Sequence, residues 1–171
     1  MVISFALLAD TSAFCQPQKH VLVLHSYHVG FTWTDSMQRG IIDELGELED
    51  VELYVEHMDT KRTPPQLLFP SLARVYAQKY RGVDIDVIVT TDDNAFNFAV
   101  VTRAVLFSGA PIVFCGVNSY GPERLQGNTD ITGVAESVDF LGGTELILTL
   151  FPKTTTIAVI SDVTPTGDLH K

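Results

Sequence analysis

The chain has 171 residues, 46% of them hydrophobic and 19% charged, which is enough apolar material to bury the core of one globular domain. Its formal net charge of -10 disfavours nucleic acid and anionic lipid as partners, because both are held chiefly by Lys and Arg. No apolar run approaches the roughly 20 residues that cross a bilayer, so any membrane attachment would come from a segment C-terminal to this chain.

Residues 1–16 have the order of a signal-peptide remnant. An apolar stretch over residues 2–9 is followed by the small residues 11–13 and then by polar ones. A basic segment does not precede the stretch, so the alternative is a frayed apolar terminus. We expect export and a periplasmic or other extracytoplasmic location. The two cysteines, Cys15 and Cys115, do not indicate a disulfide framework.

Strand-like and helix-like patterns alternate along the next part of the chain. We predict strands over residues 21–25, 51–55, 86–90, 111–115 and 131–134. We predict helices between them over residues 35–48, 63–80 and 94–107. Such alternation implies a parallel sheet with helices on both faces, joined by right-handed crossovers. The predicted fold class is α/β, a doubly wound parallel sheet of the flavodoxin-like type.

The pattern changes after residue 134. A helix is predicted over residues 140–150 and a buried strand over residues 155–161. One helix and one strand cannot form a layer of their own. They therefore either complete the first sheet or begin a second domain.

Three of the predicted strands end in polar clusters: residues 25–28, residues 90–94 and residues 116–119. Ligands of open parallel sheets bind outside the carboxyl ends of the strands, so the clusters predict one small-molecule site. The histidines of the first cluster, His25 and His28, lack a third ligand nearby in sequence and favour a scaffold role over zinc binding.

Asp92, Asp93 and Asn94 stand where a strand gives way to a helix, so they can face a ligand at the helix N-terminus. Helix capping, worth about 1 kcal/mol, is the alternative for any one of them. Two adjacent acids could also hold a hard cation or act as an acid and base pair, but no further carboxylate on the same loop has a convincing spacing.

Two further residues are candidates for ligand contact. Trp33, predicted to lie in a loop, is placed either to stack on a planar or cationic ligand or to pack on the first helix. Asn118 offers donors and an acceptor beside Gly116, although a turn would use the same residues.

Five segments together resemble the substrate-binding proteins of ABC transporters, of the periplasmic-binding-protein type I-like kind. They are VLVLHSY at 21–27, FTWTD at 31–35, YVEHMDTKR at 54–62, VIVTTDDNA at 87–95 and FCGVN at 114–118. More narrowly, they resemble the form of this domain that serves as the extracytoplasmic sensor of bacterial histidine kinases and diguanylate cyclases.

The resemblance implies two α/β lobes that close around a solute by hinge motion. Residues 17–135 would be the first lobe, and residues 136–171 the hinge and the start of a truncated second lobe. The implied ligand-binding residues are Tyr27, Trp33, Asp92, Asp93, Asn94, Asn118 and Asp162. An acidic pair facing the cleft favours a ligand with an ammonium group, as an amino acid has.

The resemblance favours a small-solute sensor domain, the N-terminal input part of a two-component histidine kinase or a related signalling protein. We expect that this chain is not itself an enzyme and that any kinase or cyclase activity resides C-terminal to it. It would bind a small organic solute without a cofactor or metal, and form a homodimer or contact an ABC permease. The solute-binding component of an importer and a small enzyme using Asp92 and Asp93 stay open as alternatives.

Overall fold

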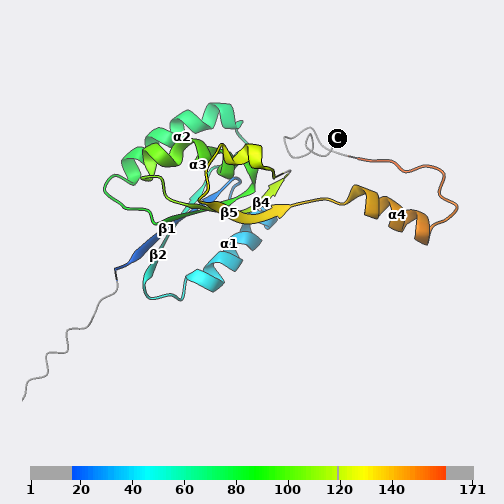
Figure 1. The fold of residues 1–171 in the computed structure, drawn as a ribbon, viewed down its shortest axis with the longest axis horizontal. Coiled ribbons are helices and arrows are strands. Elements are labelled where there is room, and N and C mark those ends of the chain that lie inside the picture. Colours follow the sequence, from blue (N-terminus) through cyan, green and yellow to red (C-terminus); the bar gives the residue numbers. More distant parts are fainter. Residues whose placement is uncertain (1–16, 119, 161–171) are drawn as a thin grey trace, which may run out of the picture.

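The computed structural model describes residues 17–118 and 120–160. The predicted signal-peptide remnant and Asp162 lie outside this range. Figure 1 shows the elements in order. They are β1 (Lys19–His25), α1 (Thr32–Leu45), β2 (Val51–His57), α2 (Pro65–Lys79), β3 (Val87–Thr91), α3 (Asp92–Leu106), β4 (Ile112–Asn118), the 3-10 helix η1 (Pro122–Leu125), β5 (Ile131–Glu136) and α4 (Phe140–Leu150).

The five strands form one parallel sheet in the order β2-β1-β3-β4-β5. The predicted fold class is therefore confirmed: the protein is an α/β protein with a doubly wound, flavodoxin-like sheet. The chain runs outward from β1 to β2 and then returns to the other side of β1, so the strand order reverses between β1 and β3. Ligands of such sheets bind outside the carboxyl ends of the strands at this reversal.

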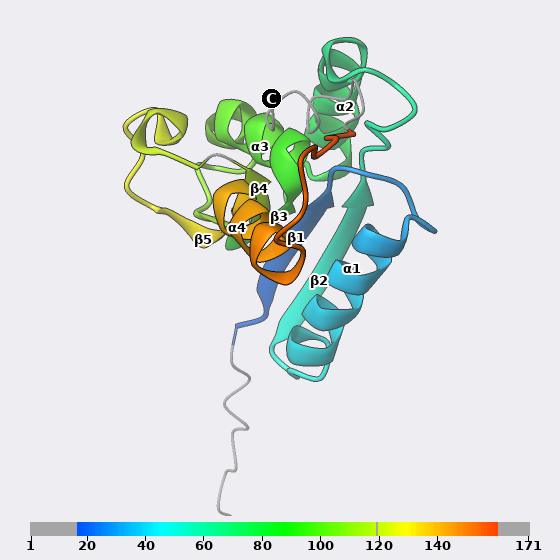
Figure 2. The same ribbon diagram turned by 90° about the vertical axis from the view of Figure 1, so that its right-hand side faces the viewer.

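Helices cover the two faces of the sheet unequally. Figures 1 and 2 show α2 and α3 together on one face and α1 on the other. Right-handed crossovers require this, because the step from β1 to β2 and the later steps run in opposite directions. The core lies between the sheet and helices α2 and α3, where Leu22, Phe96 and Phe98 are inaccessible to solvent. On the α1 face, Val134 of β5 is 70% exposed.

Two elements, α1 and β4, differ most from their predicted bounds. Helix α1 begins at Thr32 and ends at Leu45, three residues before each predicted limit. The Asp35 carboxylate accepts a hydrogen bond from the Gly30 amide at 2.9 Å, so this acid stabilises the turn that precedes the helix. Strand β4 continues to Asn118 through a bulge at Gly116, whose φ of +71° favours glycine.

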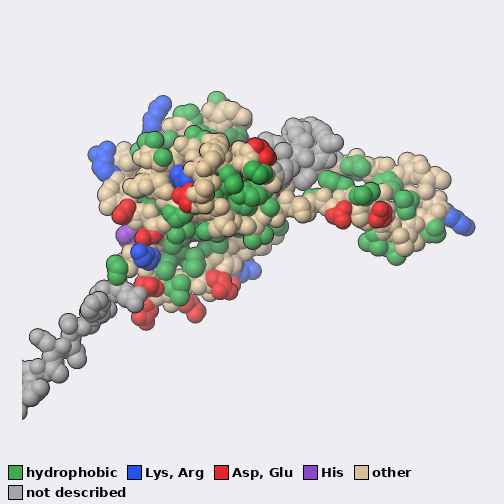
Figure 3. All heavy atoms as spheres, in the orientation of Figure 1, with side chains coloured by type: hydrophobic (Ala, Val, Ile, Leu, Met, Phe, Trp, Pro, Cys, Tyr) green, Lys and Arg blue, Asp and Glu red, His purple; other side chains and the backbone are tan. Residues whose placement is uncertain are grey.

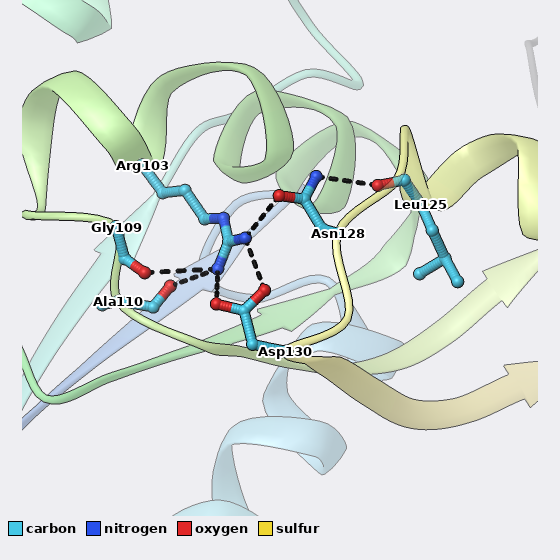
Figure 4. A network of polar contacts seen from close by, with 6 residues as sticks. All are labelled: Arg103, Gly109, Ala110, Leu125, Asn128 and Asp130. Atoms are coloured by element: carbon cyan, nitrogen blue, oxygen red, sulfur yellow. Dashed lines mark hydrogen bonds and ion pairs between the residues drawn. The ribbon is translucent and has the colours of Figure 1, made fainter.

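A buried arginine fixes the end of the sheet next to β5. The Arg103 side chain, on α3, binds both carboxylate oxygens of Asp130 at 2.6 and 2.7 Å. It also donates to the carbonyls of Gly109 and Ala110 and to Asn128 Oδ1 (Figure 4). One side chain thus joins α3 to the segments that enter β4 and β5.

The C-terminal part of the described chain stands apart from the sheet (Figure 1). Helix α4 spans the predicted residues, and the Asp139 carboxylate caps it by accepting from the Gly142 amide at 2.7 Å. None of the residues of α4 is buried, and Figure 3 shows hydrophobic side chains over its surface.

The strand predicted over residues 155–161 is not present in its described part, because residues 154–160 are neither helix nor strand. A strand requires a partner for its backbone groups, and in the described structure this segment pairs with none. Within residues 17–118 and 120–160, no helix is both long and apolar enough to span a membrane.

Candidate functional site

The junction between β3 and α3 lies at the centre of the carboxyl edge of the sheet. Ser26, at the end of β1, donates its hydroxyl hydrogen to the Thr91 carbonyl at 2.7 Å and accepts from the Ala95 amide at 2.8 Å. The N-cap residue Thr91 makes no side-chain cap bond. The hydroxyl of Ser26, directly after β1, thus satisfies the Ala95 amide near the start of α3.

Asp92 is the most unusual residue of this junction. It is the first residue of α3, its φ is +65°, and its side chain is buried at 5% exposure. A non-glycine residue in this conformation is uncommon and indicates local strain. The Oδ2 atom of Asp92 has no hydrogen-bond partner among the described residues.

The surroundings of Asp92 favour its protonated form. Burial raises the pKa of this carboxyl to about 7. The charges of Asp93 and Glu136 add to the rise in pKa, because like charges disfavour ionisation. Hydrogen bonding from Trp33 and the positive charge of Lys61 oppose this rise in pKa. Asp92 is thus poised to change its charge near neutral pH.

Trp33 lies beside Asp92, in the first turn of α1 rather than in the predicted loop. Its side chain is 44% exposed. A Cβ atom added at Gly116 would lie 3.6 Å from Cζ2 of Trp33 and 3.7 Å from Oδ1 of Asp92. The bulge in β4 therefore brings the backbone at Gly116 against both side chains, and the indole presents an open surface next to a buried carboxyl.

Asp93 is committed to other groups. Its carboxylate accepts from Asn118 Nδ2 at 2.8 Å and from the Arg124 guanidinium at 2.6 Å. Arg124 also donates to the Asn118 carbonyl and to Asn97 Oδ1. The Asp93 carboxylate is thereby paired with a cation, so Asp92 and Asp93 do not form the free acidic pair that the sequence predicted. No pattern in the sequence singled out Arg124.

Asn118 reaches the same junction from the end of β4. Its side-chain amide donates to Asp93, while its Oδ1 atom has no partner among the described residues. The residue is only 2% exposed. Two unpaired buried acceptors, from Asp92 and Asn118, thus lie at neighbouring strand ends.

Tyr27 and Asn94, the two remaining candidates within the described chain, contact other protein groups at this edge. Tyr27 is buried and packs edge-on against Phe31, with the Lys61 ammonium 4.6 Å from its ring centre. Asn94 donates to the Thr60 hydroxyl at 2.9 Å. Both residues hold loops together, and Trp33 is the one exposed aromatic side chain among the sequence-predicted site residues that the structure describes.

Two histidines lie at the ends of the neighbouring strands β1 and β2. The rings of His25 and His57 stack with their centres 4.8 Å apart, and His25 Nδ1 lies 2.9 Å from the Thr91 hydroxyl. Burial lowers the pKa of His25 to about 4, and the charge of His57 adds to this shift. Among the residues that the structure describes, no group of three or more His, Cys, Asp or Glu is arranged to hold a metal.

An apolar groove opens from the site along the α1 face of the sheet. Its volume is about 680 Å³, and Trp33, Gly116 and Glu136 line it together. Met37 and Val134 are among its apolar walls. Glu136, the last residue of β5, lies directly beside Asn118 in the strand register. The sequence analysis did not select Glu136.

Replacing Asp92 by asparagine is expected to stabilise the fold, and by more at pH 8 than at pH 5. An unfolded Asp ionises near pH 3.8, whereas folded Asp92 ionises near pH 7, so between these values the folded chain binds more protons. Protonated Asp92 therefore leaves the fold at full stability at low pH, and the free energy of unfolding falls as the pH rises to about 7. Urea unfolding of both proteins at the two pH values measures the difference. Asp43→Asn, on the exposed side of α1, is the control, and an equal gain at both pH values would contradict the expectation.

Comparison with known proteins identifies a shared fold. No protein-family model and no curated protein matches the chain. The crystal structure of a conserved domain protein from Vibrio cholerae O1 biovar El Tor strain N16961 is similar, with a TM-score of 0.56 and 19% sequence identity. The match covers 80% of this chain and 45% of that one, so this chain spans less than half of its length. Similarity at this identity concerns the fold alone.

Proposed function

We propose that this chain is an extracytoplasmic domain that binds a small solute and serves as the input part of a bacterial signalling protein. The observation that carries the proposal is the pair of unpaired, buried acceptors, Asp92 Oδ2 and Asn118 Oδ1, at the carboxyl edge of the sheet. The edge lies where the strand order reverses, which is the usual ligand position in this fold class.

The energetics of this edge favour a binding role. A buried polar atom without a partner costs about 1 to 3 kcal/mol, and the strained conformation of Asp92 adds a cost of similar size. Such costs cluster where a protein meets a ligand, because the ligand supplies the missing partners. Neither feature improves the packing of the lobe itself.

A hinged second lobe would complete the binding site. Under this proposal residues 17–135 form the first lobe, and residues 136–171 form the hinge and the beginning of the second. The solute would then be enclosed between two surfaces, of which the edge of β1, β3 and β4 is one. A histidine kinase or diguanylate cyclase would receive the signal C-terminal to this domain.

The alternatives differ in what they require. The solute-binding component of an ABC importer would use the same site, and only the output would differ. An enzyme based on Asp92 and Asp93 has less support, because Arg124 and Asn118 already hold the Asp93 carboxylate. Asp92 alone, with its pKa near 7, would remain as a general acid or base.

A thermal-shift screen of amino acids and other small solutes, against the chain extended through the complete second lobe, tests the proposal. A solute that binds the folded state alone adds about 2.7 kcal/mol of stability at a hundredfold excess over its Kd. We expect a saturable rise in Tm from one chemical class, reduced in Asn118→Ala and retained in the exposed control Asp43→Asn. A panel without any saturable shift would contradict solute binding, and turnover of a solute would point to the enzyme instead.

A further inference from the structure

Glu136 takes the role that the sequence analysis predicted for Asp93, that of a second carboxylate at the site. Arg124 binds the Asp93 carboxylate, whereas Glu136 lines the same groove as Trp33, and the charges of both carboxylates act on Asp92. The charged side chains among the described residues that line the groove are Glu44 and Glu136, both acidic. A cation is therefore the ligand charge that complements this surface.

We propose that the site binds the ammonium group of an organic amine between the indole of Trp33 and the carboxylate of Glu136, with Asp92 as a second counter-charge behind them. This inference rests on the proposed function and names the class of its solute. The amine would contact Trp33 on α1 and Glu136 on β5. Asp92 would not touch the amine: its negative charge would act from behind the indole and the bulge at Gly116.

The three groups have complementary roles. The exposed face of Trp33 attracts a cation through its ring quadrupole, and a neighbouring carboxylate strengthens this attraction. The apolar groove wall at Val134 offers a surface for the hydrocarbon part of an amine. Asp92 Oδ2 is buried without a partner, so a cation nearby stabilises its ionised form across a poorly screened region.

Binding is then coupled to the release of a proton. An ammonium group near Asp92 favours the carboxylate and lowers its pKa, while the amine itself stays charged well above pH 8. Because Asp92 in the unliganded protein, acted on by Asp93, Glu136, Trp33 and Lys61, has a pKa of about 7, part of the binding energy is spent on its deprotonation at lower pH. The affinity is expected to rise by up to about tenfold between pH 6 and pH 8.

Trp33 is the single tryptophan of the chain, so its fluorescence reports directly on the site. The test titrates the 171-residue chain with 2-phenylethylamine at pH 6 and pH 8. Two compounds with a similar hydrocarbon part, 2-phenylethanol and 3-phenylpropanoate, remove or reverse the charge. We expect saturable quenching by the amine, tighter at pH 8, and at least tenfold weaker binding of the other two compounds.

Variants separate the contributions of the carboxylates. Glu136→Gln is expected to weaken amine binding about tenfold at both pH values, and Asp92→Asn to abolish the difference between pH 6 and pH 8. Asp43→Asn is the control, since it removes a carboxylate from an exposed position of α1 that does not line the groove. It is expected to leave the affinity unchanged. Urea unfolding of each variant confirms that it is folded.

The possible results distinguish the ammonium site from solute binding in general. Equal binding of the alcohol or the acid, or full affinity in Glu136→Gln, would overturn the ammonium site. A saturable Tm shift by a solute of another class, without quenching by the amine, would also overturn it and leave solute binding standing. The absence of any stabilising solute would overturn both.

Discussion

Replacing Arg103 by alanine is expected to lower the free energy of unfolding by about 3 kcal/mol. Arg103 is 6% exposed, and its guanidinium binds Asp130, Asn128 and two backbone carbonyls at once. Its loss leaves the carbonyl of Ala110 without a donor in a buried position and opens a cavity beside α3. The value is at the lower end for a buried charge because water can reach the half-exposed Asp130 carboxylate.

Two further variants serve as controls for Arg103→Ala. Arg103→Lys keeps the charge but not the planar group of donors, so it should recover only part of the loss. Arg74→Ala, at an exposed position on α2, should change the stability by less than about 0.5 kcal/mol. Urea unfolding measures all three, and an Arg103→Ala protein as stable as Arg74→Ala would show that the network contributes nothing.

Replacing Gly133 by alanine is expected to disrupt the pairing of β5 with β4, at a cost of about 3 kcal/mol. A Cβ atom at this position would lie 2.0 Å from the Phe114 carbonyl oxygen and 2.7 Å from the Phe114 amide nitrogen. Both are backbone atoms of β4, so no side-chain rotation relieves the contact. The edge strand would have to move away, which would also carry Glu136 out of the site.

Gly40→Ala is the matched control for this change. Gly40 lies inside α1, and a Cβ atom there meets nothing within 4 Å. Alanine at this helical position should stabilise the protein by about 0.5 to 1 kcal/mol. Urea unfolding, with amide exchange along residues 131–136, measures both variants. Unchanged exchange and stability in Gly133→Ala would contradict the expectation.

The sequence predicted the sheet well because its signals are local. Continuous apolar runs such as residues 21–24 are typical of strands in the middle of a parallel sheet, which are buried on both faces, and polar residues mark where each run ends. The start of α1 was missed because Asp35 looks like a helix-starting residue, whereas its carboxylate binds back to Gly30, ahead of the helix. The predicted strand over residues 155–161 depended on a partner strand, which no local pattern specifies.

The site was predicted only in outline. Its location at the carboxyl edge follows from the fold: Asp92 and Trp33 meet there at Gly116, and Asn118 binds the adjacent Asp93. The pairing of Asp93 with Arg124 spans 31 positions in the chain, so the sequence had no means of separating the two adjacent acids. Glu136 enters through the register of β5 against β4, which is a tertiary property.

Helix α4 carries a consequence for how this part of the chain folds. An isolated helix of 11 residues is marginal in water, and Gly142 and Gly143 weaken its first turn by about 1 kcal/mol each. Its surface is nearly all apolar, with Glu145 as its single charged residue. The ordering of residues 140–150 is therefore thermodynamically linked to whatever surface covers them, and their helicity is a property of that contact rather than of the segment itself.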